Sequence, residues 1–94
     1  DSFITPSGDG RVIMDFSGKE LVAISKSLAE TAVQTIFKVL QRQEKDIITI
    51  FYKSHLGQDL IDSIIASAEE RGILAEFFSV PAQSLPCEMT ISFE

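Results

Sequence analysis

The chain has 94 residues, which is enough for one folded domain but not for two. Its hydrophobic content of 45% predicts a modest globular core, and no apolar run approaches the ~20 residues that a membrane span needs. Its formal net charge of −6, without a run of lysine or arginine, disfavours binding to nucleic acid or to an anionic membrane, because both need clustered cations.

The first residues predict no regular structure. Residues 1–10 contain Pro6, Gly8 and Gly10, which indicates a linker or an amino-terminal extension. The sequence opens without methionine, and we interpret it as a fragment of a longer protein whose single domain spans 11–94.

Two strands and a helix are expected next. Apolar residues in 11–16 and 19–25 flank a glycine-containing pair, which predicts a β-hairpin. The alternative is a helix from Ser17, because apolar residues also recur at helical spacing over 21–28. A Ser-x-x-Glu capping box then begins a helix at Ser27, and apolar residues at 3.6-residue spacing continue it.

A strand and a second helix follow. Residues 47–52 are all β-branched or aromatic, which is typical of a central strand that is buried on both faces. Apolar residues recur at helical spacing over 55–70, where Ser54 can act as the N-cap and Gly72 as the C-cap glycine.

Two further strands complete the pattern. The run 74–80 is largely apolar and ends at Pro81, and 88–94 alternates polar and apolar residues, as in an antiparallel strand with one solvated face. The order is ββαβαββ, so we expect an α/β domain of the two-layer α+β kind with a mixed sheet. Both helices should lie on one face, because crossovers between parallel strands are right-handed.

Residue types that carry catalysis are few. His55 is the only histidine and Cys87 the only cysteine, so no intrachain disulfide can form and no set of metal ligands is complete. We interpret them as a surface histidine and a non-catalytic thiol of a cytoplasmic protein; the alternative is a small enzyme that pairs them as base and nucleophile.

The acidic residues Asp59 and Asp62 share a helix face that we expect to be solvated. We therefore do not interpret them as the pair of catalytic carboxylates of a glycosidase. No catalytic, cofactor-binding or metal-binding residue is predicted.

The predicted strands carry more apolar side chains than one layer of helices can cover. Residues 47–52 are apolar on both faces, and Phe77 and Phe78 point to opposite faces of their strand. We therefore expect the second face of the sheet to expose large apolar groups, which another domain or protein covers. The alternative is that residues 1–10 fold across it.

Several short motifs also follow one another in a fixed order. They are Ser17-Gly18-Lys19-Glu20-Leu21-Val22-Ala23, Ser27-Leu28-Ala29-Glu30, Ile48-Thr49-Ile50-Phe51-Tyr52 and Met89-Thr90-Ile91-Ser92-Phe93-Glu94. This series resembles the C-terminal region of the large subunit of bacterial fatty acid kinase, in the dihydroxyacetone-kinase-like (DAK phosphatase) family, and it favours the hairpin over the early helix. The chain departs from the family at Lys53, where the family has glycine, and at 81–84, where only Gln83 of a Gly-Gly-Gln-Pro loop is kept.

The resemblance implies a non-catalytic role in phospholipid synthesis. In the family, the ATP-binding kinase domain precedes this region, which is linked to docking of the fatty-acid-binding subunit whose acyl group is phosphorylated. Such a domain would bind neither ATP, Mg²⁺ nor fatty acid, and its partners would be that subunit and the other domains of its own chain. The alternatives are self-association as a homodimer and a small interaction module unrelated to lipids.

The predicted topology also places a contact surface. If the two strands that flank the second helix are parallel, the loops that follow them lie at the same end of the sheet. That brings Tyr52, Lys53 and His55 close to Pro81 and Gln83. Tyrosine and histidine suit an interface with the partner, because they are amphipathic and have few rotatable bonds.

Overall fold

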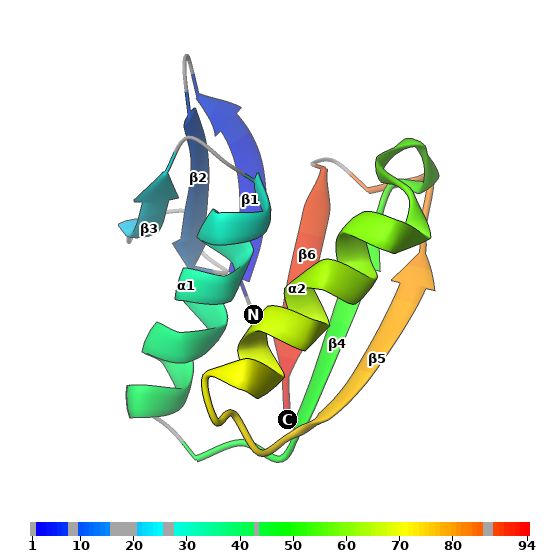
Figure 1. Ribbon diagram of the computed structural model, residues 1–94. Helices are drawn as coiled ribbons and strands as arrows, with labels where there is room; N and C mark the ends of the chain where they lie inside the picture. The colour runs from blue at the N-terminus through cyan, green and yellow to red at the C-terminus, as the bar shows by residue number, and fades with distance from the viewer. Residues whose placement is uncertain (1, 8–9, 16–20, 26–27, 43, 86–87) are drawn as a thin grey trace.

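The computed structural model describes residues 2–7, 10–15, 21–25, 28–42, 44–85 and 88–94 (Figure 1). In these residues six strands and two α-helices follow one another in the order βββαβαββ, with a short 3-10 helix, η1, before the second α-helix. The elements are β1 (Ser2–Ser7), β2 (Gly10–Asp15), β3 (Leu21–Ser25), α1 (Leu28–Arg42), β4 (Ile47–Tyr52), η1 (Ser54–Leu56), α2 (Gln58–Glu70), β5 (Glu76–Pro81) and β6 (Met89–Phe93).

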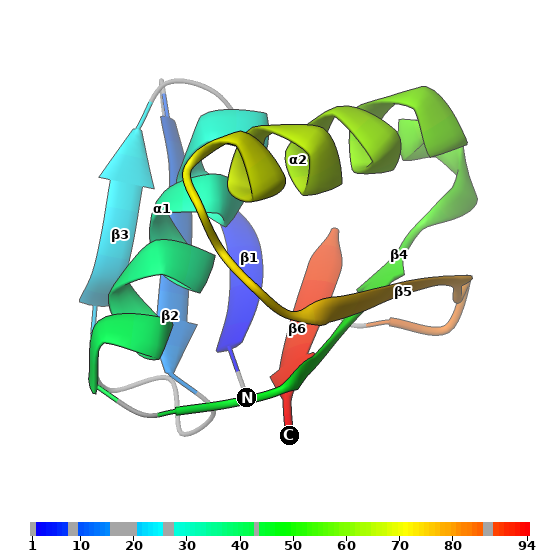
Figure 2. The same ribbon diagram turned by 60° about the horizontal axis from the view of Figure 1, so that its bottom comes forward.

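The six strands form one mixed sheet in the order β3-β2-β1-β6-β4-β5. β4 and β5 are parallel, whereas the other neighbouring pairs are antiparallel. Both helices lie on the same side of the curved sheet, with α1 against β1, β2 and β3 and α2 over β6 and β4 (Figures 1 and 2). The expected class is confirmed as an α+β fold with a mixed sheet and two helices on one face.

The amino-terminal strand corrects one expectation. Residues 2–7, predicted as part of a linker, form β1 in the middle of the sheet. β1 forms a hairpin with β2 that is closed by the pair Ser7 and Gly10, and it pairs with β6 over Ser2–Ile4. Pro6 therefore lies next to the last residue of β1, and Gly10 is the first residue of β2. Because β1 lies within the sheet, the alternative in which this segment folds across the second face is also wrong.

β2 and β3 form the hairpin that the sequence predicts, so the early helix is excluded. The two strands are antiparallel, with a register shift between Ile13 and Met14. α1 begins at Leu28, directly after the predicted cap. The cap residue Ser27 lies outside the described residues, as does Cys87.

α2 begins later than predicted. Ser54 starts η1 and does not cap α2, because Gly57, at φ 86° and ψ 146°, separates the two helices and is itself the N-cap residue, without a capping side chain. Gly72 follows the last turn of α2 at φ 84°, in agreement with the predicted C-cap glycine. α1 has 15 residues and α2 has 13, and no helix in the described part of the chain is long and apolar enough to cross a membrane.

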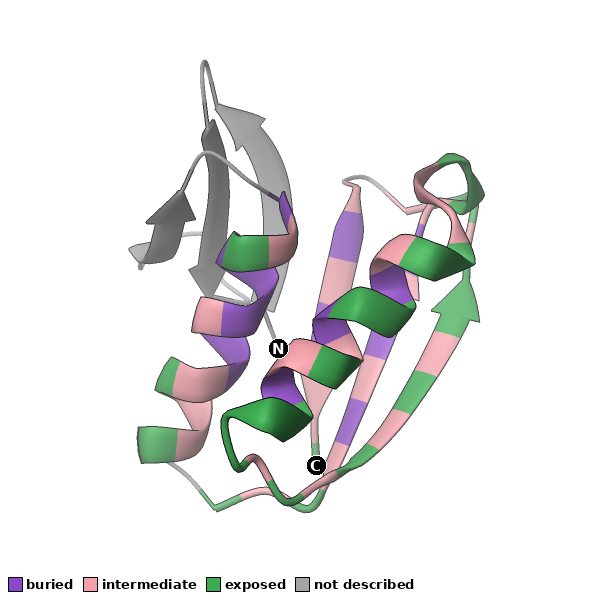
Figure 3. Ribbon diagram, viewed as in Figure 1, coloured by how far each residue is buried: buried purple, intermediate pink, exposed green. Residues whose placement is uncertain are grey.

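The core lies between the sheet and the two helices (Figure 3). β4 contributes the buried side chains of Ile48, Ile50 and Tyr52, and β6 contributes Met89 and Ile91. The helices contribute the buried apolar residues Leu28, Ala32, Val33, Ile36, Ile61, Ile64 and Ala68. The apolar stripes predicted for both helices therefore face the sheet, and the alternation predicted for the last strand is present in β6.

Candidate functional site

The loops that follow β4 and β5 meet at one end of the sheet, as predicted for parallel strands. Tyr52 and Pro81 are register partners, and the N–H of Ala82 donates a 2.8 Å hydrogen bond to the carbonyl oxygen of Tyr52. The N–H of Ser54 donates to Oε1 of Gln83 at 3.2 Å, which joins the two loops. The residues predicted for the partner interface, which we call the loop end, are Tyr52, Lys53, His55, Pro81 and Gln83.

The loop end is also joined to the start of β6. Nε2 of His55 lies 2.8 Å from Oε2 of Glu88, and the N–H of Lys53 donates to the carbonyl oxygen of Glu88 at 3.1 Å. The imidazole is 62% exposed, and ion pairs of this kind contribute about 0–1 kcal/mol to stability. Cys87 lies outside the described residues, so the structure gives no distance between Cys87 and His55. The alternative of a catalytic pair is therefore not tested.

Tyr52 is part of the core, which corrects its predicted place on the exposed surface. Its side chain is 4% exposed, and its hydroxyl donates a 2.6 Å hydrogen bond to Oε1 of Gln58. Nε2 of Gln58 donates in turn to Oδ1 of Asp62 at 2.9 Å and to Oγ of Ser79 at 3.2 Å. This network holds the start of α2 against β4 and β5, so Tyr52 positions the loop end without being presented to a partner.

The acidic residues of α2 form a solvated face, as predicted. Asp59 and Asp62 are exposed. Among the residues that the structure describes, no group of three or more His, Cys, Asp and Glu side chains is placed to hold a metal ion. Among the described side chains, the exposed His55 lies beside the carboxylate of Glu88, and a histidine in such a position can act as an acid or a base.

The second face of the sheet carries a mixture of apolar and hydroxyl side chains where β5, β4 and β6 lie side by side, and we call this surface the open face. Side chains on these strands alternate between the helix side and the open face. Register partners place two cross-strand rows on it, Ser92-Thr49-Phe78 and Thr90-Phe51-Val80. Phe78 is 47% exposed and Val80 is 39% exposed, and β5 carries exposed residues along much of its length (Figure 3).

The chemistry of the open face suits contact with a protein surface. Its two rows contain aromatic, aliphatic and hydroxyl side chains but no charged ones, and the next pair on the same face, Ile47 and Glu76, adds one exposed carboxylate at its end. Depletion of charge and enrichment of aromatic side chains are typical of the buried centre of a protein interface. The sequence indicated this surplus of apolar residues on the strands, but it could not show which rows they form, because the register of β6 against β4 is set by the fold.

Comparisons of the chain with protein-family models, with curated proteins and with solved structures give no match.

Proposed function

We propose that this domain is a non-catalytic docking module that binds a protein partner through the open face of β5, β4 and β6. The observation that carries the proposal is the partly exposed pair Phe78 and Val80, which belong to two adjacent uncharged rows. Full burial of such side chains contributes roughly 1.5–3 kcal/mol each, so a partner that covers the remaining exposed half of both gains on the order of 2 kcal/mol.

The partner that we propose is the fatty-acid-binding subunit of a cytoplasmic fatty acid kinase. Support for this identity comes from the series of motifs along the chain that resembles the C-terminal region of the kinase subunit. In this role the domain contributes no group to phosphoryl transfer. It holds the subunit that carries the acyl group, while a kinase domain elsewhere in the parent protein binds ATP.

Calorimetric titration of the 94-residue chain with a purified fatty-acid-binding subunit tests the proposal. Phe78→Thr and Val80→Thr keep strand propensity but remove apolar contact area, so each should weaken binding about tenfold. Leu74→Thr is the matched control, because Leu74 is also an exposed apolar residue but lies outside the open face. Equal affinity in all three variants and the parent chain would contradict docking at this surface.

Self-association through the same face is the second candidate. β5 is an edge strand of the sheet, so the open face reaches the rim of the molecule, where a second copy has access. Sedimentation equilibrium of the chain alone separates the two functions. A monomer at about 100-fold the concentration used in the titration would remove this candidate, and a dimer that Phe78→Thr dissociates would favour it.

A further inference from the structure

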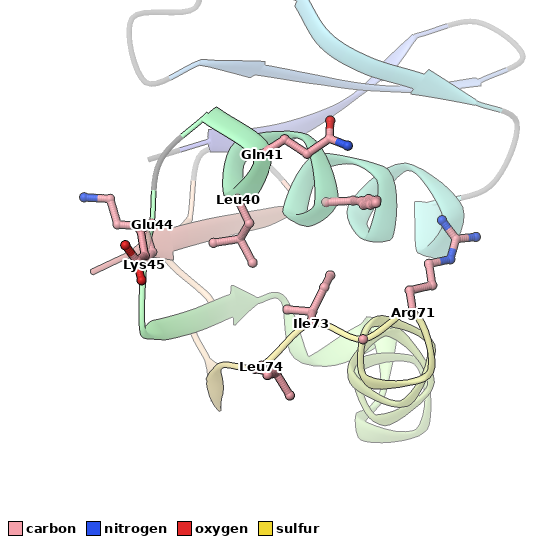
Figure 4. A pocket seen from close by; sticks show the side chains of 9 residues that line it. Leu40, Gln41, Glu44, Lys45, Arg71, Ile73 and Leu74 are labelled. Carbon is pink, nitrogen blue, oxygen red and sulfur yellow. The ribbon is translucent and has the colours of Figure 1, made fainter.

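One edge of the sheet is formed by β5, and no element in the described part of the chain covers it. β5 is the last strand in the order β3-β2-β1-β6-β4-β5, and Figures 1 and 2 show no helix or strand beyond it. The segment that enters β5 packs elsewhere, because Ile73 points toward Leu40 of α1 at a pocket of about 310 Å³, whereas Leu74 points away from both (Figure 4). The outer side of β5 is thus accessible to another chain.

The hydrogen bonds to β4 show which backbone groups of β5 point outward. The N–H of Glu76 donates to the carbonyl oxygen of Asp46, and the N–H of Ala82 donates to that of Tyr52. In a parallel pair, every second residue of a strand directs both its N–H and its C=O toward the neighbouring strand. The even-numbered residues of β5 therefore bond to β4, and the odd-numbered residues direct their backbone groups away from the sheet.

Three residues of β5 present backbone groups at the outer edge. Phe77 and Ser79 each direct an N–H and a C=O outward, and no described residue pairs with these groups. Pro81 directs only a C=O outward, and the ladder to β4 does not need the N–H that proline lacks. The residues between Glu76 and Pro81 include no charged side chain, although charge is a common protection of a sheet edge against pairing.

The outward groups are self-complementary in one register. In an antiparallel pair, two opposed residues exchange both of their N–H···O=C bonds. When β5 meets β5 of a second copy about a two-fold axis, Phe77 opposite Ser79 forms such a pair twice, and every outward group of both residues is used. With Ser79 opposite Ser79 instead, Phe77 would face Pro81, whose missing N–H leaves a carbonyl oxygen without a donor.

The same register suits the side chains on the open face. Phe78 lies opposite Phe78 of the second copy, at a non-hydrogen-bonded position where side chains of the two strands are closest. Aromatic pairs at such positions stabilise antiparallel strands. Glu76 lies opposite Val80, so the carboxylates of the two copies are not opposed, as like charges there would be destabilising.

We propose that two copies of this chain join edge to edge through antiparallel β5 strands, in the register that places Phe77 opposite Ser79. Addition of a strand to an exposed sheet edge is a common mode of recognition, in which main-chain hydrogen bonds supply affinity. The pairing uses backbone groups of the edge, whereas the docking function uses side chains of the open face. It therefore does not rest on that function, and it differs from self-association through the open face.

Amide hydrogen exchange, followed by nuclear magnetic resonance in ~0.15 M salt to screen the net charge of −6, tests the pairing in the unaltered chain. In dilute solution the N–H groups of Phe77 and Ser79 should exchange rapidly, whereas β4 protects those of Phe78 and Val80. With a Kd on the order of 100 μM, exchange at Phe77 and Ser79 should be about fivefold slower at about 1 mM protein. Phe78 and Val80 should change little.

A substitution at Ser79 tests the same hydrogen bonds by sedimentation equilibrium. Ser79→Pro removes the outward N–H and leaves the bonds to β4, so it should weaken dimerisation at least about tenfold. Ser79→Ala is the matched control, because it also removes the hydroxyl that accepts from Gln58 but keeps the N–H, and it should associate as the parent chain does. The amide spectrum of each variant reports its folding.

Charge at position 80 tests the register. Val80→Lys places a cation opposite Glu76 of the second copy, whereas Val80→Glu places two carboxylates opposite each other. The first variant should therefore dimerise about tenfold more tightly than the second. The same two substitutions at Ala66, which is exposed on α2, change the net charge equally and should make little difference.

Four results would each overturn the proposal. They are a monomer at about 1 mM protein, exchange at Phe77 and Ser79 that does not depend on concentration, a dimer that Ser79→Pro leaves intact, and equal dimerisation of the two Val80 variants. The exchange measurement decides the matter if Ser79→Pro does not fold, because it needs no substitution.

Discussion

The hydroxyl of Tyr52, at the end of β4, donates a 2.6 Å hydrogen bond to Oε1 of Gln58, the first residue of α2. This bond crosses the chain reversal made by η1 and Gly57. It therefore holds the start of α2 against the end of β4, beside Lys53, His55 and Gln83 of the loop end.

Removal of this hydroxyl should cost a measurable but small part of the stability. Tyr52→Phe keeps the packing of the ring and leaves Oε1 of Gln58 without its donor, so we expect the free energy of unfolding to fall by about 1 kcal/mol. Tyr52→Ala also empties the buried site and should cost about 3–5 kcal/mol. Urea denaturation measures both. A Tyr52→Phe variant as stable as the parent chain would show that the bond contributes nothing.

The two glycines with positive φ should differ in their tolerance of a side chain. A Cβ would meet no atom within 4 Å at Gly57 or Gly72, so substitution reports backbone strain alone. Gly72→Ala should cost about 1–2 kcal/mol, as expected of a left-handed residue. Gly57→Ala should cost up to about 3 kcal/mol, because φ 86° and ψ 146° lie in a region that only glycine populates readily.

Thermal denaturation of the two alanine variants gives the comparison, and Gly72→Asn provides a control. Asparagine tolerates the left-handed conformation, so Gly72→Asn should lie closer to the parent chain than Gly72→Ala. A larger loss at Gly72 than at Gly57 would be inconsistent with the backbone conformations described above.

β1 should be essential to the fold and not a removable extension. Ile4 has register partners on both sides, Ile13 in β2 and Met89 in β6, so Ile4→Pro removes a sheet hydrogen bond whichever way its N–H points. We expect a loss of more than about 2 kcal/mol. Ile4→Val is the matched control, because valine keeps a β-branched side chain and the backbone N–H. A proline variant as stable as the valine variant in urea denaturation would argue against a central β1.

The exposed contacts of the loop end should matter little for stability. His55→Ala removes the pair with Glu88, and Gln83→Ala removes the acceptor for the N–H of Ser54. Each should change the free energy of unfolding by less than about 1 kcal/mol, since water replaces the lost contact. Urea denaturation checks this. A larger loss would mean that these contacts hold the loops in place, and the variants would then be unsuitable for binding measurements.

Local patterns in the sequence predict most of the fold. The period-2 burial of β6 and the apolar stripe of α2 follow from side-chain spacing alone, and the same spacing identifies Ile91 and Ile64 as core residues. The C-cap at Gly72 follows from local backbone chemistry. These features depend on residues that are close together in the chain.

The features that the sequence does not reveal depend on distant residues. β1 forms a local hairpin with β2, but Pro6 gives this strand the appearance of a loop, and its place in the middle of the sheet depends on β6 at the other end of the chain. Burial of Tyr52 is equally hidden, because a tyrosine at a strand end suits either a core or an interface. The rows of the open face require the register between β6 and β4, which no local pattern specifies.

One measurement decides where a partner docks. The 94-residue chain, labelled with ¹⁵N, is titrated with the fatty-acid-binding subunit, and the backbone amide signals are followed to saturation. Docking at the open face predicts shifts or broadening at Thr49, Phe78 and Val80, with Lys53 and Gln83 little changed. Changes confined to the loop end, or no saturable change at any residue, would contradict the account.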